Sequence, residues 1–412
     1  MFKSGRVWYF LGSAISQLLT LAASFYIVKD SNAANFGQFS FFVALATIVG
    51  SISTLKFEQS IVVSDSFEDS RQKFRLTIQV ALIVNIVLMP ILYIVLGSRT
   101  NVFDLFLVFI VANNIVLNAC IQQAFMFVEN HFLNGLFNVC YSLVNFIFIY
   151  LLISKPEGLQ ISYTLAYVIS SLIFMLWLIK FKFTFKFLSY KKSLELFRVN
   201  KQYPLYIFPG AVLSIFLSYG HPVFITYLYN EKLVGLFSIS NRVLMLPTIV
   251  IGSVVAGLFR VKISKLYFSN DRKNIYKESL NVLKFLALSS IVIYPLLVYV
   301  ISNINHYIKL TGWEGIEKVA PLLSIYVLAQ YFYIPMSNIP LVCERKRLLF
   351  NMNLYQFILN VIVYVIAFAF GFSFYLFLIV LSISMFVFCM AACVIFLRDI
   401  KKEYVGEVVY NV

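Results

Sequence analysis

Residues 10–62 read FLGSAISQLLTLAASFYIVKDSNAANFGQFSFFVALATIVGSISTLKFEQSIV, which is two long apolar segments joined by a short polar turn. The stretch recurs later in the chain. A shift of 198 positions aligns nine identical residues in 31 without a gap, including Gly12 with Gly210 and Asn32 with Asn230. A weaker echo at a shift of 205 aligns MPILYIV (89–95) with YPLLVYV (294–300). Duplicated helical bundles are common in alternating-access carriers, so the sequence predicts two copies of one bundle.

The composition places both copies in lipid. The chain is 61% hydrophobic and 12% charged, with a mean hydropathy of +0.87, whereas soluble domains are about 25% charged. Continuous apolar runs of this length cross a bilayer as helices, because lipid offers no partner to backbone groups. We expect twelve spans, at about residues 7–28, 36–55, 77–97, 102–128, 133–153, 160–180, 205–229, 235–259, 280–303, 318–342, 350–371 and 373–397.

The predicted fold class is therefore an all-α integral membrane protein with two pseudo-symmetric six-helix lobes around a central cavity. The first lobe is expected at residues 1–190, with helices one to six and the start of a basic linker, and the second at residues 191–412. No large segment is left for a soluble domain.

Basic residues are distributed unevenly between the loops. The termini and the even-numbered loops carry 25 Lys and Arg residues, whereas the other loops carry six. By the positive-inside rule this predicts that both termini are cytoplasmic. The net charge of +15 then follows mostly from topology, and no nucleic-acid partner is expected.

The basic linker of residues 180–204 reads KFKFTFKFLSYKKSLELFRVNKQYP. Its basic and aromatic residues alternate before a short amphipathic stretch. Two interpretations remain open. One is a helix lying on the cytoplasmic lipid surface that also attracts lipid phosphates. The other is a solvated connector that merely obeys the positive-inside rule.

Metal and cofactor chemistry has no support in the sequence. Cys389 and Cys393 share a helix face, but no His or carboxylate accompanies them, so we expect packing residues. His131, His221 and His306 have no ligand spacing. No phosphate-binding loop of the G-x-x-x-x-G-K-[ST] kind occurs, so direct ATP drive is not expected and no cofactor is predicted.

Polar residues inside the spans are costly in hydrocarbon unless they face protein or water. They form stripes at helical spacing on several predicted helices, and the candidate substrate contacts among them are Gln17, Asn114, Asn118 and Asn138. Such side chains can hydrogen-bond a sugar. The competing interpretation is contact between neighbouring helices.

Charged residues within or beside the spans are candidates for binding an anionic substrate or carrying a proton. Arg242, beside Asn241, lies about 10 Å inside the eighth predicted helix, and Pro247 is expected to kink that helix. A guanidinium suits phosphate oxygens; the alternative is a structural pair with a carboxylate. Glu58 and Asp30 are the candidates for proton coupling, against plain interfacial charges.

Several stretches resemble one transporter family. They are GSAISQLL (12–19), NFGQFSFFVALATIVGSIS (35–53), KFEQSIVV (56–63) and LVGLFSISNRVLMLPTIVIGSVVAGLF (233–259). Together they look like the Wzx-type O-antigen and polysaccharide flippases of the multidrug/oligosaccharidyl-lipid/polysaccharide exporter superfamily. Members often have a Gly before the Leu-Glu of the second helix, where this chain has Lys56, Phe57 and Glu58.

The resemblance implies a flippase, not an enzyme, in the bacterial inner membrane. It would move undecaprenyl-diphosphate-linked oligosaccharide from the cytoplasmic to the periplasmic leaflet, with Arg242 on the diphosphate and the amides on sugars. Coupling to the proton gradient is implied too. The implied partners are the lipid-linked oligosaccharide, membrane lipids, a polysaccharide polymerase and a chain-length regulator.

Three other classes are weighed against this function. A drug or cation antiporter of the same superfamily would need acidic groups inside the first lobe, and no Asp or Glu lies mid-span. A membrane-embedded polysaccharide polymerase would need a large outer loop bearing carboxylates, and the longest expected outer loop is only residues 303–317. A peptidoglycan-precursor flippase usually has two further helices.

Overall fold

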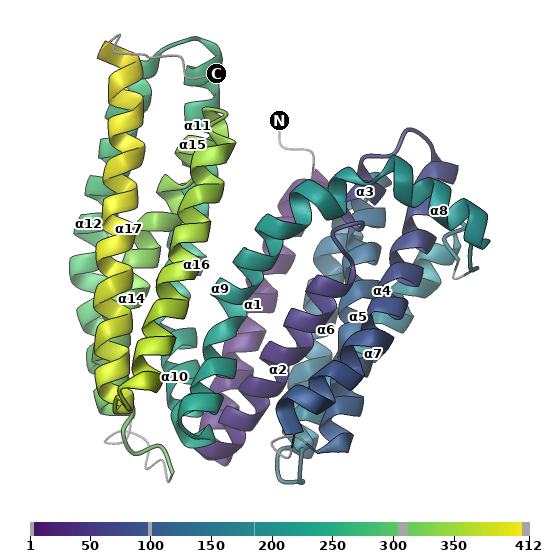
Figure 1. The fold of residues 1–412 in the computed structure, drawn as a ribbon, viewed down its shortest axis with the longest axis horizontal. Coiled ribbons are helices and arrows are strands. Elements are labelled where there is room, and N and C mark those ends of the chain that lie inside the picture. Colours follow the sequence, from purple (N-terminus) through teal and green to yellow (C-terminus); the bar gives the residue numbers. More distant parts are fainter. Residues whose placement is uncertain (1–3, 98–100, 185, 304–311, 406–412) are drawn as a thin grey trace. The chain divides into compact units, whose positions relative to one another are not determined.

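The computed structural model describes residues 4–97, 101–184, 186–303 and 312–405, and every regular element in these ranges is a helix (Figure 1). By their internal contacts the residues group into two units, Met1–Tyr227 and Leu228–Val412. The expected lobes at residues 1–190 and 191–412 stay a prediction.

The first unit holds the helices α1 to α9. Their bounds are α1 (Ser4–Asp30), α2 (Ala33–Ser53), α3 (Gln59–Val62), α4 (Phe67–Leu96), α5 (Val102–Phe127), α6 (His131–Leu152), α7 (Gly158–Ile179), α8 (Tyr190–Val199), the π-helical turn η2 (Tyr203–Ile207) and α9 (Phe208–Leu228). Helix α5 is central, because α2, α4, α6 and α7 all pack against it. Its buried residues Cys120 and Phe125 belong to a core that includes Phe137 and Phe174.

The second unit holds the remaining helices. These are α10 (Glu231–Leu244), the π-helical turn η3 (Thr248–Gly252), α11 (Ser253–Phe268), α12 (Arg272–Ser302), α14 (Ile316–Met336), α15 (Asn338–Val342), α16 (Lys346–Ala369) and α17 (Phe374–Val405). Helix α14 packs against α10, α12 and α17. Cys389 and Cys393 are free and buried in this core beside Tyr333 and Phe396, as expected of packing residues.

The number of spans agrees with the sequence. Among the described residues, eleven helices are long and apolar enough to cross a membrane, and a bent pair formed by α10 with η3 and α11 raises the number to as many as twelve. The prediction of an all-helical membrane protein with about twelve spans is therefore confirmed.

The internal repeat is visible in how the helices begin and where their prolines lie. Asn32 accepts a hydrogen bond from the Asn35 amide at 2.9 Å, and Asn230, its counterpart in the repeat, accepts one from the Leu233 amide at 3.0 Å. Both caps satisfy an amide that the first turn leaves without a partner. The long helices α4 and α12 also each contain an interior proline, at Pro90 and Pro295.

Helices α1 and α6 approach each other at a glycine pair. A Cβ atom at Gly12 would lie 2.6 Å from the carbonyl oxygen of Gly135. Further along the same pair of helices, the hydroxyls of Ser16 and Ser142 are 2.6 Å apart. Small residues allow backbones this close in a membrane, where dispersion and interhelical hydrogen bonds drive association.

Replacing Gly12 with alanine is expected to destabilise the protein by about 1–3 kcal/mol, the usual cost of overpacking. The control is Gly257→Ala, since a Cβ at Gly257 meets nothing within 4 Å. The measurement is the thermal unfolding midpoint of the purified protein. Equal midpoints for the two variants would contradict the close approach of α1 and α6.

Candidate functional site

Helix α10 carries the one cation predicted to contact substrate. The helix begins at Glu231, four residues earlier than expected, so Arg242 is eleven positions along it. At 1.5 Å per residue this places Arg242 about 16 Å from the start of α10, deeper than the expected 10 Å. The residue is half-buried.

Polar atoms gather beside Arg242. In the described part of the protein, the buried side-chain oxygens of Asn241, Ser238 and Ser240 have no hydrogen-bond partner. Ser238 precedes Arg242 by four residues and thus lies on the same side of the helix. Because an unsatisfied buried polar atom costs about 1–3 kcal/mol, a ligand that bonds to Asn241 and Ser238 would be stabilised there.

The span that carries Arg242 is broken just after it. Helix α10 ends at Leu244, and α10 and the following helical segment from Thr248 to Phe268 are bent by 43°. Pro247 lies in the break and the π-helical turn η3 follows it. The kink predicted at Pro247 is therefore confirmed, and Arg242 lies in the last turn before it.

Tyrosines of two neighbouring helices pack beside the break between α10 and α11. Thr248 Oγ1 in η3 lies 3.2 Å from the hydroxyl of Tyr294 in α12. The Tyr294 ring meets Tyr331 of α14 edge-on at 5.8 Å, and the Tyr331 hydroxyl is 2.9 Å from Ser289 Oγ. This network was not predicted from the sequence. Its members lie on three segments far apart in the chain. The sequence predicted the kink at Pro247 but not the residues that pack around it.

In the first unit the predicted amides bond mainly to neighbouring helices. Asn118 in α5 is buried and its Oδ1 accepts a hydrogen bond from Ser171 Oγ of α7 at 2.7 Å. Asn138 Oδ1 in α6 accepts one from Gln122 of α5 at 3.5 Å. Asn114 donates to its own helix, to the Ile110 carbonyl at 2.9 Å. These contacts fit the alternative interpretation, in which such amides join helices.

Gln17 differs from the other predicted amides because it is exposed on α1. The polar stripe predicted through Gln17 did not include Ser16, one position earlier, which contacts Ser142 of a neighbouring helix. A second missed pair is Asn85 Nδ2 with Asn113 Oδ1 at 3.1 Å, which joins α4 to α5. Nothing in the spacing of either pair distinguished it from other polar residues in the spans.

A cluster of tyrosines in the first unit was also missed. The rings of Tyr141 and Tyr167 are 4.6 Å apart, those of Tyr163 and Tyr167 are 5.0 Å apart, and Phe39 of α2 meets Tyr163 edge-on at 5.7 Å. The three tyrosines are half-buried. Each keeps a hydroxyl on an apolar ring, a combination suited to a polar partner.

The two carboxylates predicted to couple transport to protons, Glu58 and Asp30, have different surroundings. Glu58 is 6% exposed, its Oε1 lies 3.3 Å from Lys56 Nζ, and its Oε2 has no hydrogen-bond partner among the described residues. The sequence did not predict this ion pair, because residues two apart on a helix do not face each other. Residues 54–58 form a turn in which Leu55 and Lys56 are left-handed, at φ 48° and 64°. Asp30 is exposed at the end of α1.

An exposed ion pair joins the start of α10 to the loop before α14. Lys232 Nζ lies 2.9 Å from Glu314 Oε2. The hydrogen bond from Lys232, with help from the Gly312 amide, lowers the pKa of Glu314 to about 2. A lowered pKa in the folded state means that the pair contributes at pH values above the ordinary Glu value and is lost as the pH falls towards 2.

Metal binding finds no support in the described residues, where no group of three or more His, Cys, Asp or Glu side chains could hold an ion. His131 is half-buried at the start of α6 and His221 is buried in α9. His306 lies outside the described residues.

Several solved transporters share this arrangement of helices. An inward-facing multidrug resistance MATE family transporter of the MOP superfamily matches with a TM-score of 0.69, over 95% of this chain and 96% of that one. The lipid II flippase MurJ, in an inward closed conformation, matches with a TM-score of 0.72, over 97% and 89%. The chain has the MATE/MurJ-like transporter fold. Both structures are 15% identical to it in sequence.

A third structure adds a contrast in chemistry. It is a MOP superfamily transporter from Pyrococcus furiosus, described as having a binding pocket of reverse polarity that suggests a different function, and it matches with a TM-score of 0.60 at 14% identity, over 97% of this chain and 95% of that one. No protein-family profile and no curated protein matches this chain.

The buried Glu58–Lys56 pair is expected to stabilise the fold. Glu58→Gln leaves Lys56 without its anion, and we expect a loss of about 1–3 kcal/mol, less than for a fully buried pair because Lys56 is partly exposed. The measurement is the thermal unfolding midpoint. The control is Glu314→Gln in the exposed pair, which should change the midpoint little. A Glu58→Gln midpoint equal to that of the control would argue against a buried pair.

Proposed function

We propose that the protein is a flippase that moves a diphosphate-linked lipid oligosaccharide, such as an O-antigen repeat unit, from the cytoplasmic to the periplasmic leaflet of the bacterial inner membrane by alternating access. Two observations support this function. The fold is that of MATE transporters and of MurJ, and the second unit places Arg242 deep in a span beside polar atoms that lack partners.

The depth of Arg242 is the observation that carries the proposal. About 16 Å of helix separates it from the start of α10, which is roughly half of a 30 Å hydrocarbon layer. A guanidinium at that depth is costly unless it meets a partner or water. Its planar set of donors matches two phosphate oxygens at once, and Asn241 beside it adds an amide.

The placement of acidic residues favours an anionic over a cationic substrate. Asp30, Asp104 and Glu231 lie at or within about one turn of a helix end, and Glu278 and Asp399 lie within about two turns of the ends of α12 and α17. A carrier of cationic drugs would place a carboxylate inside a span to compensate the substrate charge. This contrast separates the proposal from a drug antiporter, which the fold alone would equally allow.

Sugars would be held by neutral polar groups. The half-buried tyrosines Tyr141, Tyr163 and Tyr167 offer hydroxyls on flat apolar faces. The amides Asn138 and Gln17 retain hydrogen-bonding capacity, since Gln17 is exposed and the bond to Asn138 is long at 3.5 Å. We assign the sugar contacts to these groups rather than to Asn118, whose oxygen is bound to Ser171.

For coupling we propose Glu58 as the proton-carrying group instead of Asp30. Glu58 is buried and keeps one oxygen without a partner, so a proton on that oxygen would remove its charge next to Lys56. A polysaccharide polymerase and a chain-length regulator are the proposed downstream partners, since a flipped repeat unit must be polymerised on the outer side.

Deleting the gene should abolish surface glycan while lipid-linked repeat units accumulate on the cytoplasmic side. The measurement is extraction of lipid-linked oligosaccharide together with surface-glycan staining, and restoring the gene serves as the control. Normal surface glycan in the deletion strain, in a background without a second carrier, would exclude the proposed substrate. Accumulation of a cationic drug instead would favour the antiporter.

Arg242→Ala should reduce export of repeat units at least about tenfold, whereas Arg242→Lys should keep part of it, because a lysine retains the charge but not the paired donors. The control is Arg260→Ala, an exposed cation at α11. Export is compared at equal protein level. Full export by Arg242→Ala would remove Arg242 from the mechanism and leave the flippase function to be tested by the gene deletion.

A further inference from the structure

We propose that the basic linker presents a binding surface for anionic phospholipid headgroups. We call it the linker face and define it by Lys186, Phe187, Tyr190, Lys191, Arg198 and Lys201, all of which are exposed. The inference concerns resident lipids of the membrane and does not depend on which substrate is transported.

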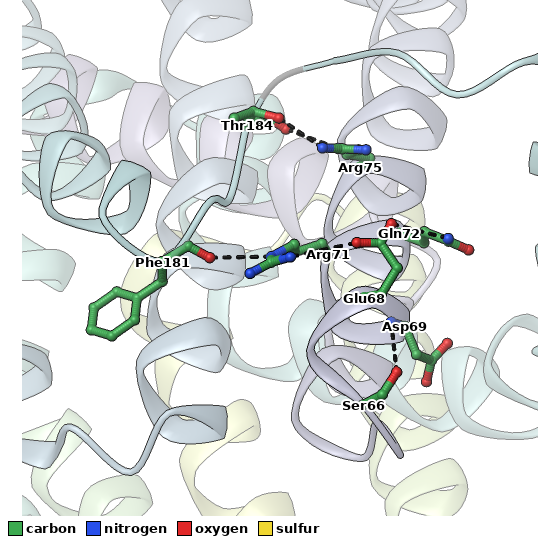
Figure 2. A network of polar contacts seen from close by, with 8 residues as sticks. All are labelled: Ser66, Glu68, Asp69, Arg71, Gln72, Arg75, Phe181 and Thr184. Atoms are coloured by element: carbon green, nitrogen blue, oxygen red, sulfur yellow. Dashed lines mark hydrogen bonds and ion pairs between the residues drawn. The ribbon is translucent and has the colours of Figure 1, made fainter.

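The linker is a docked element of the first unit. Figure 2 shows Arg71 and Arg75 of α4 reaching towards the chain after α7, where Arg71 Nε donates to the Phe181 carbonyl at 3.1 Å and Arg75 donates to Thr184 Oγ1 at 2.8 Å. Further on, the Gln79 side chain both donates to the Leu188 carbonyl and accepts from its amide, each at 3.2 Å. Three residues of α4 thus hold the linker at Phe181, Thr184 and Leu188.

Helix α8 then packs on α4 through its apolar side. Leu196 of α8 belongs to a buried cluster with Leu76 of α4, Phe57 and Tyr203, and Phe197 meets Phe57 at 5.1 Å. The opposite side of α8 is left exposed, with Tyr190, Lys191 and Arg198 on it. The linker face therefore has a fixed orientation relative to α4.

The position of α8 along α4 corresponds to the surface of the membrane. On α4 the charged residues end at Arg75, and residues 76–96 contain no Asp, Glu, Lys or Arg. That uncharged segment is about 31 Å long as a helix, which equals the thickness of the hydrocarbon layer. Since Leu196 of α8 shares a buried cluster with Leu76 of α4, α8 lies where the hydrocarbon begins.

The charge of the linker is almost entirely of one sign. Residues 180–204 contain seven basic residues and one acidic residue, Glu195. Glu195 is paired with Lys192 at 3.1 Å, and Lys180 lies over the Trp177 ring at 4.5 Å. In the described part of the chain the four cations of the linker face form no ion pair. Their charge is therefore available to phosphate groups.

Exposed aromatic residues on the same face favour lipid over other anions. Phe187 is 66% exposed and Tyr190 is 80% exposed, and aromatic side chains are typical of the membrane interface. A short helix with exposed cations and Tyr190 at this height, preceded by the exposed Phe187, matches an interfacial segment on anionic lipid. With the expected orientation, the leaflet concerned is the cytoplasmic one.

The test is native mass spectrometry of the full-length protein in detergent with equal amounts of phosphatidylglycerol and phosphatidylcholine. The wild type should retain phosphatidylglycerol preferentially. The quadruple variant K186Q/K191Q/R198Q/K201Q should lose this preference by about tenfold or more, because each basic side chain near an anionic surface contributes roughly fivefold. A triple variant K186R/K191R/K201R should keep the preference and shows that folding is intact.

The matched control removes the same number of exposed cations elsewhere, as R260Q/K265Q/K273Q/K277Q in α11 and α12. It should bind phosphatidylglycerol like the wild type. Undiminished preference in the linker variant, or an equal loss in the control, would overturn the proposal. Displacement of the lipid by inorganic pyrophosphate or by an RNA oligonucleotide at equal concentration would do so too, since it would assign the linker face to free phosphate or to nucleic acid.

Discussion

Hydrocarbon offers no hydrogen-bond partner, and this constraint shapes most of the polar chemistry described above. Inside the first unit, Asn118 bonds to Ser171, Asn85 bonds to Asn113, and the hydroxyls of Ser16 and Ser142 meet. Each contact joins two helices and removes a polar group from lipid. These contacts do not satisfy every atom, since Asn118 Nδ2 and Asn85 Oδ1 remain buried without a partner among the described residues.

Three of the buried atoms without a partner among the described residues follow one another along α10 before its break, and the others are spread over several helices. The buried oxygens of Asn241, Ser238 and Ser240 lie within one turn of Arg242. Just after Pro247, the hydroxyl of Thr248 forms a hydrogen bond with the hydroxyl of Tyr294 in α12. A supported backbone next to unsatisfied side chains is what a binding site needs, since rigidity lowers the entropy cost of recognition. The fold of MATE transporters and MurJ is compatible with such a site but does not specify its occupant.

The periodicity of the sequence was sufficient to predict the architecture but not the contacts of the candidate site. Span number, the kink at Pro247 and the equivalence of Asn32 and Asn230 follow from hydropathy, one proline and a repeat, which are local signals. The partners of Asn118 and Asn138 could not be predicted, because they depend on how helices rotate about their axes during packing. The Lys56–Glu58 pair was missed for a different reason: it depends on the left-handed residues Leu55 and Lys56, which turn the chain just after the second span.

The glycine contact between α1 and α6 restricts movement as well as stability. A Cβ atom at Gly12 would lie only 2.6 Å from a backbone oxygen of α6, and turning α1 about its axis would bring the larger Leu11 or Ser13 towards Gly135. The contact therefore favours movement of α1 and α6 together over rotation of one helix against the other.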